Sequence, residues 1–311
     1  MKKIYFTLIA LLASINMLAQ GWPANYSGVM LQGFSWDSYD YSQWTVLEKQ
    51  ADDMKGFIDL VWLPQSGKCI ETTQVMGYKP YYYFNQNSSF GTEAELRSLI
   101  AKFKANGIGA IADVVVNHRN TDGWYTFPAE TYKGVTYQML STDICKNDDD
   151  GKTATQAKKD GVSLSNNYDE GTDFGGCRDI DHKSENVQKI IKAYLKFLKE
   201  DMGYTGFRYD MVKGFSGTHV ADYNDATGVK FSVGEYWDGN INSVKGWIDA
   251  TSSGGYKSGA FDFPLYYTLG SAIKTNNYSS LAGQVPGVAG QYGYSQYGIT
   301  FVDNHDTFVK P

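Results

Sequence analysis

The segment Gly298-Ile-Thr-Phe-Val-Asp-Asn-His-Asp306 joins an apolar run to four consecutive polar residues. Polar side chains at the end of a buried strand must be solvated, hydrogen-bonded or bound to a ligand, because a buried polar group without a partner is costly. The segment therefore predicts a buried strand over 298–303 that carries a group of functional side chains at its carboxyl end.

The same pattern occurs elsewhere in the chain. Three further apolar runs carry polar residues at their ends: 110–116 before Asn117 and His118, 206–212 with Arg208 and Asp210, and 231–234 before Glu235, Tyr236 and Trp237. Four strands that all deliver polar groups at the carboxyl end indicate one shared site.

Amphipathic helices are expected between these strands, over 43–56, 93–106 and 186–202, where apolar residues recur at helical spacing. Strands are expected at 28–34, 57–63, 108–116, 206–212, 231–235, 260–264 and 298–303. Alternating strands and helices predict a parallel sheet. Seven strands without a GxGxxG or P-loop motif favour an α/β fold of the (β/α)8 TIM barrel type over a doubly wound nucleotide-binding fold.

The segment 119–181 interrupts the alternation. It is rich in Gly, Asn, Asp, Thr and Lys, and it is too long for a simple connection. We interpret it as a small irregular subdomain inserted after the third strand. Four of its acidic residues are spaced so that they can converge on a positive partner: Asp169, Asp173, Asp179 and Asp181.

The composition excludes some partners and favours another. The formal charge of −6 and the lack of a Lys/Arg block argue against nucleic acid and anionic membrane surfaces. The 24 tyrosines suit sugar binding, because their flat rings pack on sugar faces while the hydroxyls stay solvated, although tyrosines that line a core are an equal alternative for any one of them.

The first residues are typical of an export signal. Met1-Lys2-Lys3 is basic, 4–18 is apolar, and Ala19-Gln20-Gly21 offers a cleavage site. We therefore expect a signal peptide over 1–20, a secreted or periplasmic protein, and no stable membrane span after its removal; an uncleaved anchor is the alternative. The barrel then comprises 21–118 and 182–311, with 119–181 as the insert.

Three cysteines occur in the chain, Cys69, Cys145 and Cys177. Cys145 and Cys177 can pair, and three unpaired thiols are the alternative. No CxxC arrangement supports zinc or redox chemistry.

Three carboxylates, Asp210, Glu235 and Asp306, stand at the ends of different predicted strands and would face one barrel mouth. Like charges held close together raise the pKa of one member. They thereby produce a protonated acid beside an ionised nucleophile, as acetal cleavage requires. Arg208, two residues before Asp210, points to the same strand face and would keep that carboxylate ionised.

Four blocks of the chain resemble, in the right order, the signature regions of the α-amylase family, glycoside hydrolase family 13: Asp113-Val-Val-Val-Asn-His118, Gly206-Phe-Arg-Tyr-Asp-Met-Val-Lys-Gly214, Gly234-Glu-Tyr-Trp237 and Phe301-Val-Asp-Asn-His-Asp306. Gly77-Tyr-Lys-Pro80 resembles a further family element. The resemblance implies that Asp210 is the nucleophile, Glu235 the general acid and then base, and Asp306 the stabiliser of the transition state, with net retention of the α-anomer.

The same resemblance implies substrate contacts. Tyr78 would stack on the sugar at the cleavage point, His118 and His305 would bond its hydroxyls, and Arg208 would orient the nucleophile. Lys213 and Trp237 would contact the leaving-group side. A satisfied core histidine is the ordinary alternative for His118 or His305 alone.

The segment 169–182 resembles the calcium loop of plant and archaeal α-amylases. That match implies a Ca²⁺ ion held by oxygen ligands from Asn117, Asp169, Thr172, Asp179 and Gly214, with Asp173 at a possible second site. Oxygen ligands suit Ca²⁺ rather than zinc. A solvated loop without a metal is the alternative.

Two departures from the family stand out. Gly214 follows Lys213 where many amylases have His, which fits the plant and archaeal branch. The eighth strand, its helix and the usual C-terminal β-sandwich do not follow Pro311. Because a barrel without its last strand has two unpaired edges, we expect a fragment of a longer chain, with a shortened protein as the alternative.

The predicted function is secreted endo-hydrolysis of α-1,4-glucosidic bonds in starch, glycogen or maltooligosaccharides by a monomer. One alternative is a maltooligosaccharide-specific hydrolase or transglycosylase of the same family. A non-catalytic starch-binding protein, possible if the chain is truncated, is the alternative from another class.

Overall fold

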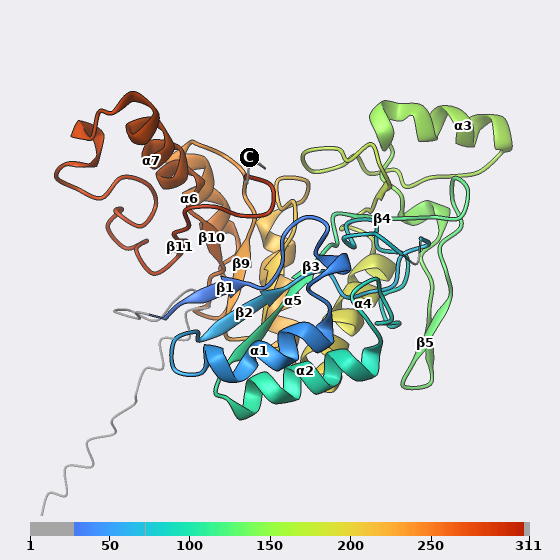
Figure 1. Ribbon diagram of the computed structural model, residues 1–311. Helices are drawn as coiled ribbons and strands as arrows, with labels where there is room; N and C mark the ends of the chain where they lie inside the picture. The colour runs from blue at the N-terminus through green and yellow to red at the C-terminus, as the bar shows by residue number, and fades with distance from the viewer. Residues whose placement is uncertain (1–27, 72, 308–311) are drawn as a thin grey trace, which may run out of the picture.

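The computed structural model describes residues 28–71 and 73–307, so the predicted signal peptide lies outside the described residues. A seven-stranded parallel sheet forms its centre (Figure 1). Its strands are β1 (Met30–Gln32), β2 (Leu60–Leu63), β3 (Gly109–Val114), β8 (Gly206–Tyr209), β9 (Ser232–Gly234), β10 (Gly259–Phe261) and β11 (Gly298–Ile299). All seven predicted strands are therefore present.

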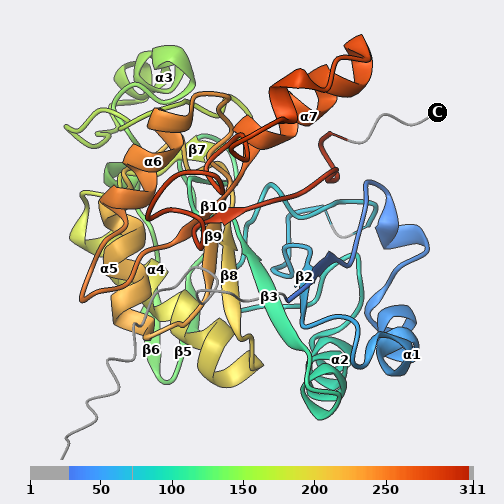
Figure 2. The same cartoon turned by 90° about the vertical axis from the view of Figure 1, so that its left-hand side faces the viewer.

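The strands follow one another around the sheet in chain order, and every neighbouring pair is parallel. Among the described residues β1 and β11 form the two edges. The sheet is curved, with helices on its outer side (Figure 2). The architecture is that of a partial (β/α) barrel, as the sequence predicted.

Several predicted strand bounds differ from the structure, and the strand expected over 206–212 ends at Tyr209. The strand expected over 260–264 stops at Phe261, because the Asp262 side chain accepts the Leu265 N–H and caps a helix that has Pro264 in its first turn. The strand expected over 298–303 is confined to Gly298–Ile299, and the residues after it form a turn that presents the polar group.

Helices cover the outer side of the sheet. The three predicted helices are confirmed as α1 (Trp44–Met54), α2 (Glu93–Ala105) and α4 (Glu185–Lys196), the last continuing as a π-helical turn over Phe197–Met202. Thr92 and Glu95 form a capping box at the start of α2. On this side of the sheet, the helices that the sequence pattern did not predict are α5 (Gly217–Thr227), α6 (Ile241–Ala250) and α7 (Phe263–Thr275).

The insert after β3 carries two small antiparallel sheets and one helix. These are β4 (His118–Arg119) with β7 (Arg178–Asp179), β5 (Glu130–Tyr132) with β6 (Val135–Tyr137), and α3 (Lys152–Asp160). Figure 1 shows α3 and β5 at opposite ends of the insert. The insert is thus more regular than the irregular subdomain that the sequence indicated.

A buried ion pair within the insert is anchored on the segment 81–84, between β2 and α2. Arg119 donates to Glu130 at 2.7 Å, with both side chains almost fully buried, and the Glu130 carboxylate also accepts the backbone N–H groups of Tyr83 and Phe84 at 2.8 Å. Removing one member of such a pair leaves a buried charge without compensation. The pair therefore holds β5 against the 81–84 segment.

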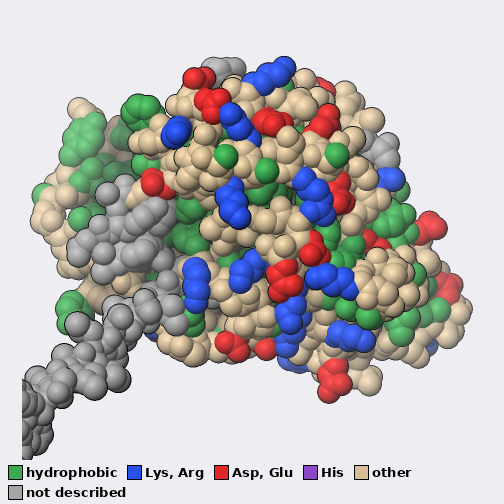
Figure 3. All heavy atoms as spheres, turned by 90° about the horizontal axis from the view of Figure 1, so that it is seen from below, with side chains coloured by type: hydrophobic (Ala, Val, Ile, Leu, Met, Phe, Trp, Pro, Cys, Tyr) green, Lys and Arg blue, Asp and Glu red, His purple; other side chains and the backbone are tan. Residues whose placement is uncertain are grey.

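On the face shown in Figure 3, basic and acidic side chains are interspersed, so this face carries no extended patch of one charge. Within the described part of the chain, none of the helices has the length and apolar character needed to span a membrane.

Candidate active site

Arg208 on β8 is the centre of the polar group at the carboxyl end of the sheet. The side chain is fully buried, and one nitrogen donates both to Asp113 Oδ1 and to Asp210 Oδ1 at 2.7 Å. Its second terminal nitrogen forms an ion pair with Glu235. Burial opposes the guanidinium charge, but the three carboxyl groups raise the Arg208 pKa well above its ordinary value.

The strand register brings the two predicted acids beside this arginine. Asp210 N–H donates to the Val114 carbonyl at 3.0 Å, and Glu235 N–H donates to the Tyr209 carbonyl at 2.9 Å, so the sheet ladder continues past the strand ends. Gly234 is required before Glu235, because a Cβ there would lie 2.1 Å from the Trp247 indole. Met211, which follows Asp210, has a φ of 45° and donates its N–H to Glu235 Oε2 at 3.1 Å. This strained backbone turn aims the two acids at one point.

Burial sets the protonation of Glu235. It raises the Glu235 pKa to about 8; Arg208 and the Met211 N–H oppose this shift, whereas Asp210 and Asp306 add to it. The direction of this shift favours the protonated form of Glu235, which a general acid requires. A protonated carboxyl group beside a second acid on the same arginine is the division of roles expected for a general acid and a nucleophile.

Asp113 is a site residue that the sequence reasoning did not single out. It is almost fully buried and accepts three hydrogen bonds, from Trp62 Nε1 at 3.1 Å, Tyr78 Oη at 3.0 Å and Arg208. Burial raises its pKa to about 6 against the pull of Arg208. In the sequence, Asp113 is distinguished only as the single aspartate in the apolar run 108–116. The pairing of the strands, which sets Asp113 opposite Arg208, shows that it belongs to the site.

His305 and Tyr78 form a stacked pair over this group. Their ring centroids lie 5.4 Å apart at an interplanar angle of 11°, and His305 Nε2 lies 2.7 Å from Tyr78 Oη and 3.2 Å from Asp306 Oδ2. Burial, with Arg208, lowers the His305 pKa to about 3, so the ring is neutral. A neutral His305 can donate from Nε2 to Tyr78, which in turn donates to Asp113, while His305 Nδ1 is buried without a partner among the described residues.

Asp306 is the most exposed of the three predicted catalytic acids. Burial raises its pKa, Arg208 opposes the shift and Asp210 adds to it. Its N–H is held at 2.9 Å by Asn304 Oδ1, which fixes the turn after β11. The turn places the carboxylate beside His305 at the rim of the site.

A cavity of about 860 Å³ opens over these groups. Asp210, Glu235 and Asp306 line it, as do the predicted substrate residues Tyr78, His118, Trp237 and His305. His118 Nε2 donates to the Tyr78 carbonyl at 2.8 Å, and its ring stacks on Phe174 at 3.8 Å. Lys213 is near the rim, donating to Asp238 at 3.1 Å and to the Trp237 carbonyl at 3.4 Å.

The predicted cation ligands converge where the insert meets the barrel. Asn117 Nδ2 donates to Asp179 at 3.1 Å. A Cβ built on Gly214 would lie 1.9 Å from Asn117 Oδ1 and 2.9 Å from the Thr172 carbonyl oxygen. Asp169 Oδ2 is buried and has no hydrogen-bond partner among the described residues. These oxygen donors fit a hard cation such as Ca²⁺.

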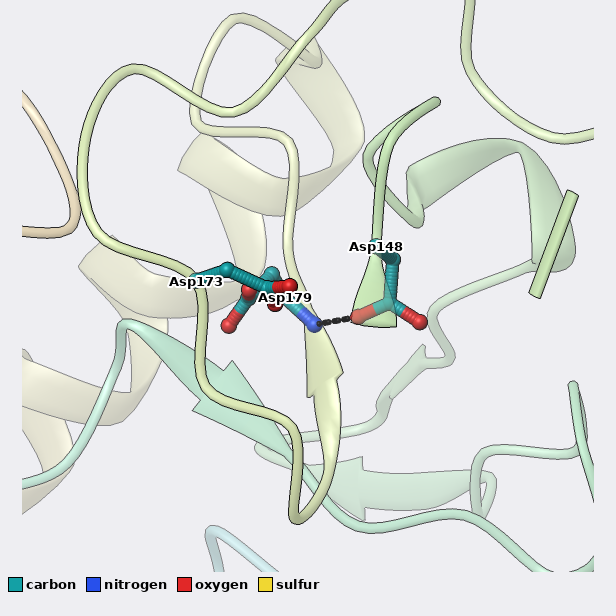
Figure 4. A group of neighbouring side chains, drawn as sticks. All are labelled: Asp148, Asp173 and Asp179. Carbon is teal, nitrogen blue, oxygen red and sulfur yellow. Dashed lines mark hydrogen bonds between the residues drawn. The ribbon is translucent and has the colours of Figure 1, made fainter. Parts of the chain in front are cut away.

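A second group of acids, Asp148, Asp173 and Asp179, lies beside this cradle, with oxygens within 4.8 Å of one another (Figure 4). Internal donors already occupy it: Asp148 accepts from Arg178 and from the Asp179 N–H at 2.6 Å, and Asp173 accepts the N–H groups of Asp149 and Asp150. Asp148 was not predicted. Asp181, predicted to converge here, instead accepts Ser165 and Asn167 at 2.6 and 2.9 Å.

All three cysteines are buried free thiols. Burial raises the pKa of Cys69 and Cys177 to about 12, and that of Cys145 further still. The three thiols are therefore unpaired, and Cys145 and Cys177 do not form a disulfide.

Paired carboxyl groups at the carboxyl end of a barrel sheet, lining a cavity, are the arrangement by which glycoside hydrolases cleave their substrates. Residues 58–252 match the family model described as "Alpha amylase, catalytic domain". The chain belongs to the α-amylase family of glycoside hydrolases.

Similar proteins extend the match to most of the chain. "Alpha-amylase 3, chloroplastic" of Arabidopsis thaliana is 32% identical over 304 residues, covering 90% of this chain and 32% of that protein. "Probable alpha-amylase 2" of the same plant is 31% identical over 297 residues, covering 90% and 67%. The solved α-amylase I of Eisenia fetida resembles the fold with a TM-score of 0.62 at 17% identity, covering 90% and 58%. The chain thus spans about a third to two thirds of these relatives.

Proposed function

We propose that the chain carries out retaining endo-hydrolysis of α-1,4-glucosidic bonds in starch, glycogen and maltooligosaccharides, as an exported protein. The observation that carries the proposal is the Arg208 guanidinium, which contacts both Asp210 and Glu235. Two carboxyl groups on one guanidinium are held close together. Retaining enzymes keep their two carboxyl groups about 5–5.5 Å apart, whereas inverting enzymes leave room for a water between them.

The reaction would proceed in two displacements. Glu235 gives its proton to the glycosidic oxygen while Asp210 attacks the anomeric carbon, so the bond to the leaving sugar breaks as the Asp210 ester forms. Glu235, now ionised, takes a proton from water, which attacks the same carbon and releases Asp210. Asp306 faces the positive charge that develops at the sugar ring, and Tyr78 and His305 bound the pocket for that sugar.

Two alternative functions differ from the proposed one in how much of this mechanism they share. A maltooligosaccharide-specific hydrolase or a transglycosylase would share the covalent intermediate, and a non-catalytic starch-binding protein would lack turnover. Digestion of starch and of maltotriose in parallel separates them. Rapid loss of iodine staining with mixed oligosaccharides supports endo attack. Preferred cleavage or elongation of maltotriose favours the first alternative, and binding without turnover favours the second.

The pH dependence of kcat/KM tests the role of Glu235. Burial raises the pKa of this acid to about 8, and only the protonated form can assist departure of the leaving sugar. We expect kcat/KM on maltoheptaose to stay high through neutral pH and to fall tenfold per pH unit above an apparent pKa near 8. An alkaline limb centred near the ordinary glutamic acid value, about 4.3, would contradict the assignment.

A Ca²⁺ ion in the cradle between insert and barrel is the second part of the proposal. Asn117, Asp169, Thr172, Asp179 and Gly214 would hold it. When bound, the ion would compensate the buried carboxylates and tie the 169–174 loop to the segment after β8, where Thr172 N–H already donates to the Lys213 carbonyl at 3.0 Å. Asp173 remains the candidate for a second ion.

Calcium removal should lower thermal stability. A ligand at about 100 times its Kd stabilises a folded protein by about 2.7 kcal/mol, so we expect Tm to fall by several degrees on adding excess EDTA and to recover with Ca²⁺. Asp169→Asn should abolish this Ca²⁺ response, whereas Asp53→Asn on the exposed face of α1 should retain it. An equal Ca²⁺ response in both variants, measured by scanning calorimetry, would rule out the cradle.

A further inference from the structure

Trp237 is fixed at the rim of the cavity by side chains from α7. Its Nε1–H donates to Tyr267 Oη at 2.7 Å, and the Phe263 ring stacks on the indole with centroids 4.8 Å apart at 21°. The indole is nevertheless 36% exposed and lines the cavity. One part of the indole is therefore held by the protein while another faces the space above the acids.

The contacts of the Tyr267 ring fix the position of its hydroxyl group. Phe263 and Tyr267 are four residues apart on α7, so they lie on the same helix face. The Tyr267 ring rests against Gly239, where a Cβ would lie 3.2 Å from its Cδ2 atom. The adjacent Tyr266 packs elsewhere, stacking on Phe301 at 5.0 Å and 7°. Trp237 thus depends on Tyr267, and not on its neighbour, for its hydrogen bond.

The position of Trp237 in the chain indicates which sugars it faces. It follows Glu235 by two residues, and in the proposed mechanism Glu235 delivers its proton to the leaving group. Lys213, on the segment after β8, donates to the Trp237 carbonyl and reaches the same rim. An exposed aromatic ring beside the general acid is suited to stacking on a sugar of the leaving-group side.

We propose that Tyr267 is a positioning residue for leaving-group sugars, acting through Trp237. This inference rests on the proposed function and names a specificity device of the same site. The Tyr267 hydroxyl holds the indole in the orientation in which its exposed surface receives a sugar ring. Without that hydrogen bond the indole samples other rotamers, and binding on the leaving-group side weakens while the acids stay in place.

Two substrates distinguish this role from a general loss of structure. Maltoheptaose places sugars on both sides of the cleaved bond, whereas α-maltotriosyl fluoride has a fluoride leaving group and no sugar on the leaving-group side. Losing one hydrogen bond weakens an interaction about three- to tenfold. We expect Tyr267→Phe to raise KM for maltoheptaose by about that factor with a smaller change in kcat. Its kinetics on the fluoride should remain within about twofold of the parent chain.

Tyr266→Phe is the matched control, since it removes the neighbouring hydroxyl from the same helix, and it should leave both substrates unaffected. Equal losses of Tyr267→Phe on both substrates, or an unchanged KM for maltoheptaose, would overturn the inference. The affinity of Asp210→Asn for maltoheptaose, with and without Tyr267→Phe, repeats the test without turnover. A parent chain that cleaves neither substrate contradicts the proposed function itself, which is a different result from selective effects of Tyr267.

Discussion

Replacing Asp210 by Asn should lower kcat on starch by a factor on the order of 10⁴ or more, because the amide cannot form the ester intermediate. The fold should survive this change. The asparagine has nearly the same shape, and Arg208 keeps its contacts with Asp113 and Glu235. Reducing-sugar release from soluble starch measures the loss, and thermal unfolding checks the fold.

Asp225→Asn is the control for that variant. Asp225 is exposed on α5, away from the cavity, so the substitution should leave kcat unchanged. Turnover by Asp210→Asn within about tenfold of the parent chain would exclude Asp210 as the nucleophile. If the parent chain itself binds maltoheptaose without turnover, the non-catalytic alternative gains support.

Arg208→Met should have the largest effect on stability. The side chain is fully buried, and its removal leaves Asp113, Asp210 and Glu235 without their shared cation. Breaking a buried ion pair by deleting one partner costs about 3–5 kcal/mol in the free energy of unfolding. We expect a loss of this size in urea unfolding at pH 8, together with loss of activity.

The sign of its pH dependence follows from the carboxyl groups. Without Arg208 the folded-state pKa values of Asp113 and Glu235, which burial already raises, move further above their unfolded values. Stability associated with such raised pKa values is present at low pH and is lost as pH rises through them. The deficit of Arg208→Met should therefore shrink between pH 8 and pH 5. A deficit that grows toward pH 5 would contradict the account.

A further variant at position 208 separates charge from packing, and a variant on α2 serves as a control. Arg208→Lys restores one positive charge but not the planar fork, so it should recover part of the stability and little activity. Arg97→Met removes a cation from a partly exposed pair with Glu93 on α2 and should cost much less.

The strands and three of the helices could be predicted because their sequences carry regular apolar periods. The helix α5 could not, since Gly217–Thr227 mixes Gly, Thr, Asn and Asp and its buried residues do not form a regular apolar stripe. The strand predicted over 260–264 overlaps the start of α7, which begins at Phe263. The capping interaction of Asp262 decides between the two, and only its geometry reveals it.

The candidate site was predictable where its residues are local and not where they depend on strand register. Arg208, Asp210 and Glu235 lie in or directly after apolar runs, so the sequence points to them. Asp113 belongs to the site because β3 pairs with β8 in a register that sets it opposite Arg208. Asp148 reaches the insert's acidic group through tertiary hydrogen bonds with Arg178 and Asp179. Neither placement is visible in a local pattern.

Trapping of the covalent intermediate tests the central claim most directly. Glu235→Gln retains Asp210 but lacks the group that activates water, and a fluoride leaving group needs no acid, so α-maltotriosyl fluoride should load this variant faster than water unloads it. Peptide mass spectrometry after rapid acid quenching should then find a maltotriosyl group on the peptide that contains Asp210, at Asp210 itself. A maltotriosyl group on another residue, or consumption of the fluoride to the β-anomer without any labelled peptide, would contradict the account.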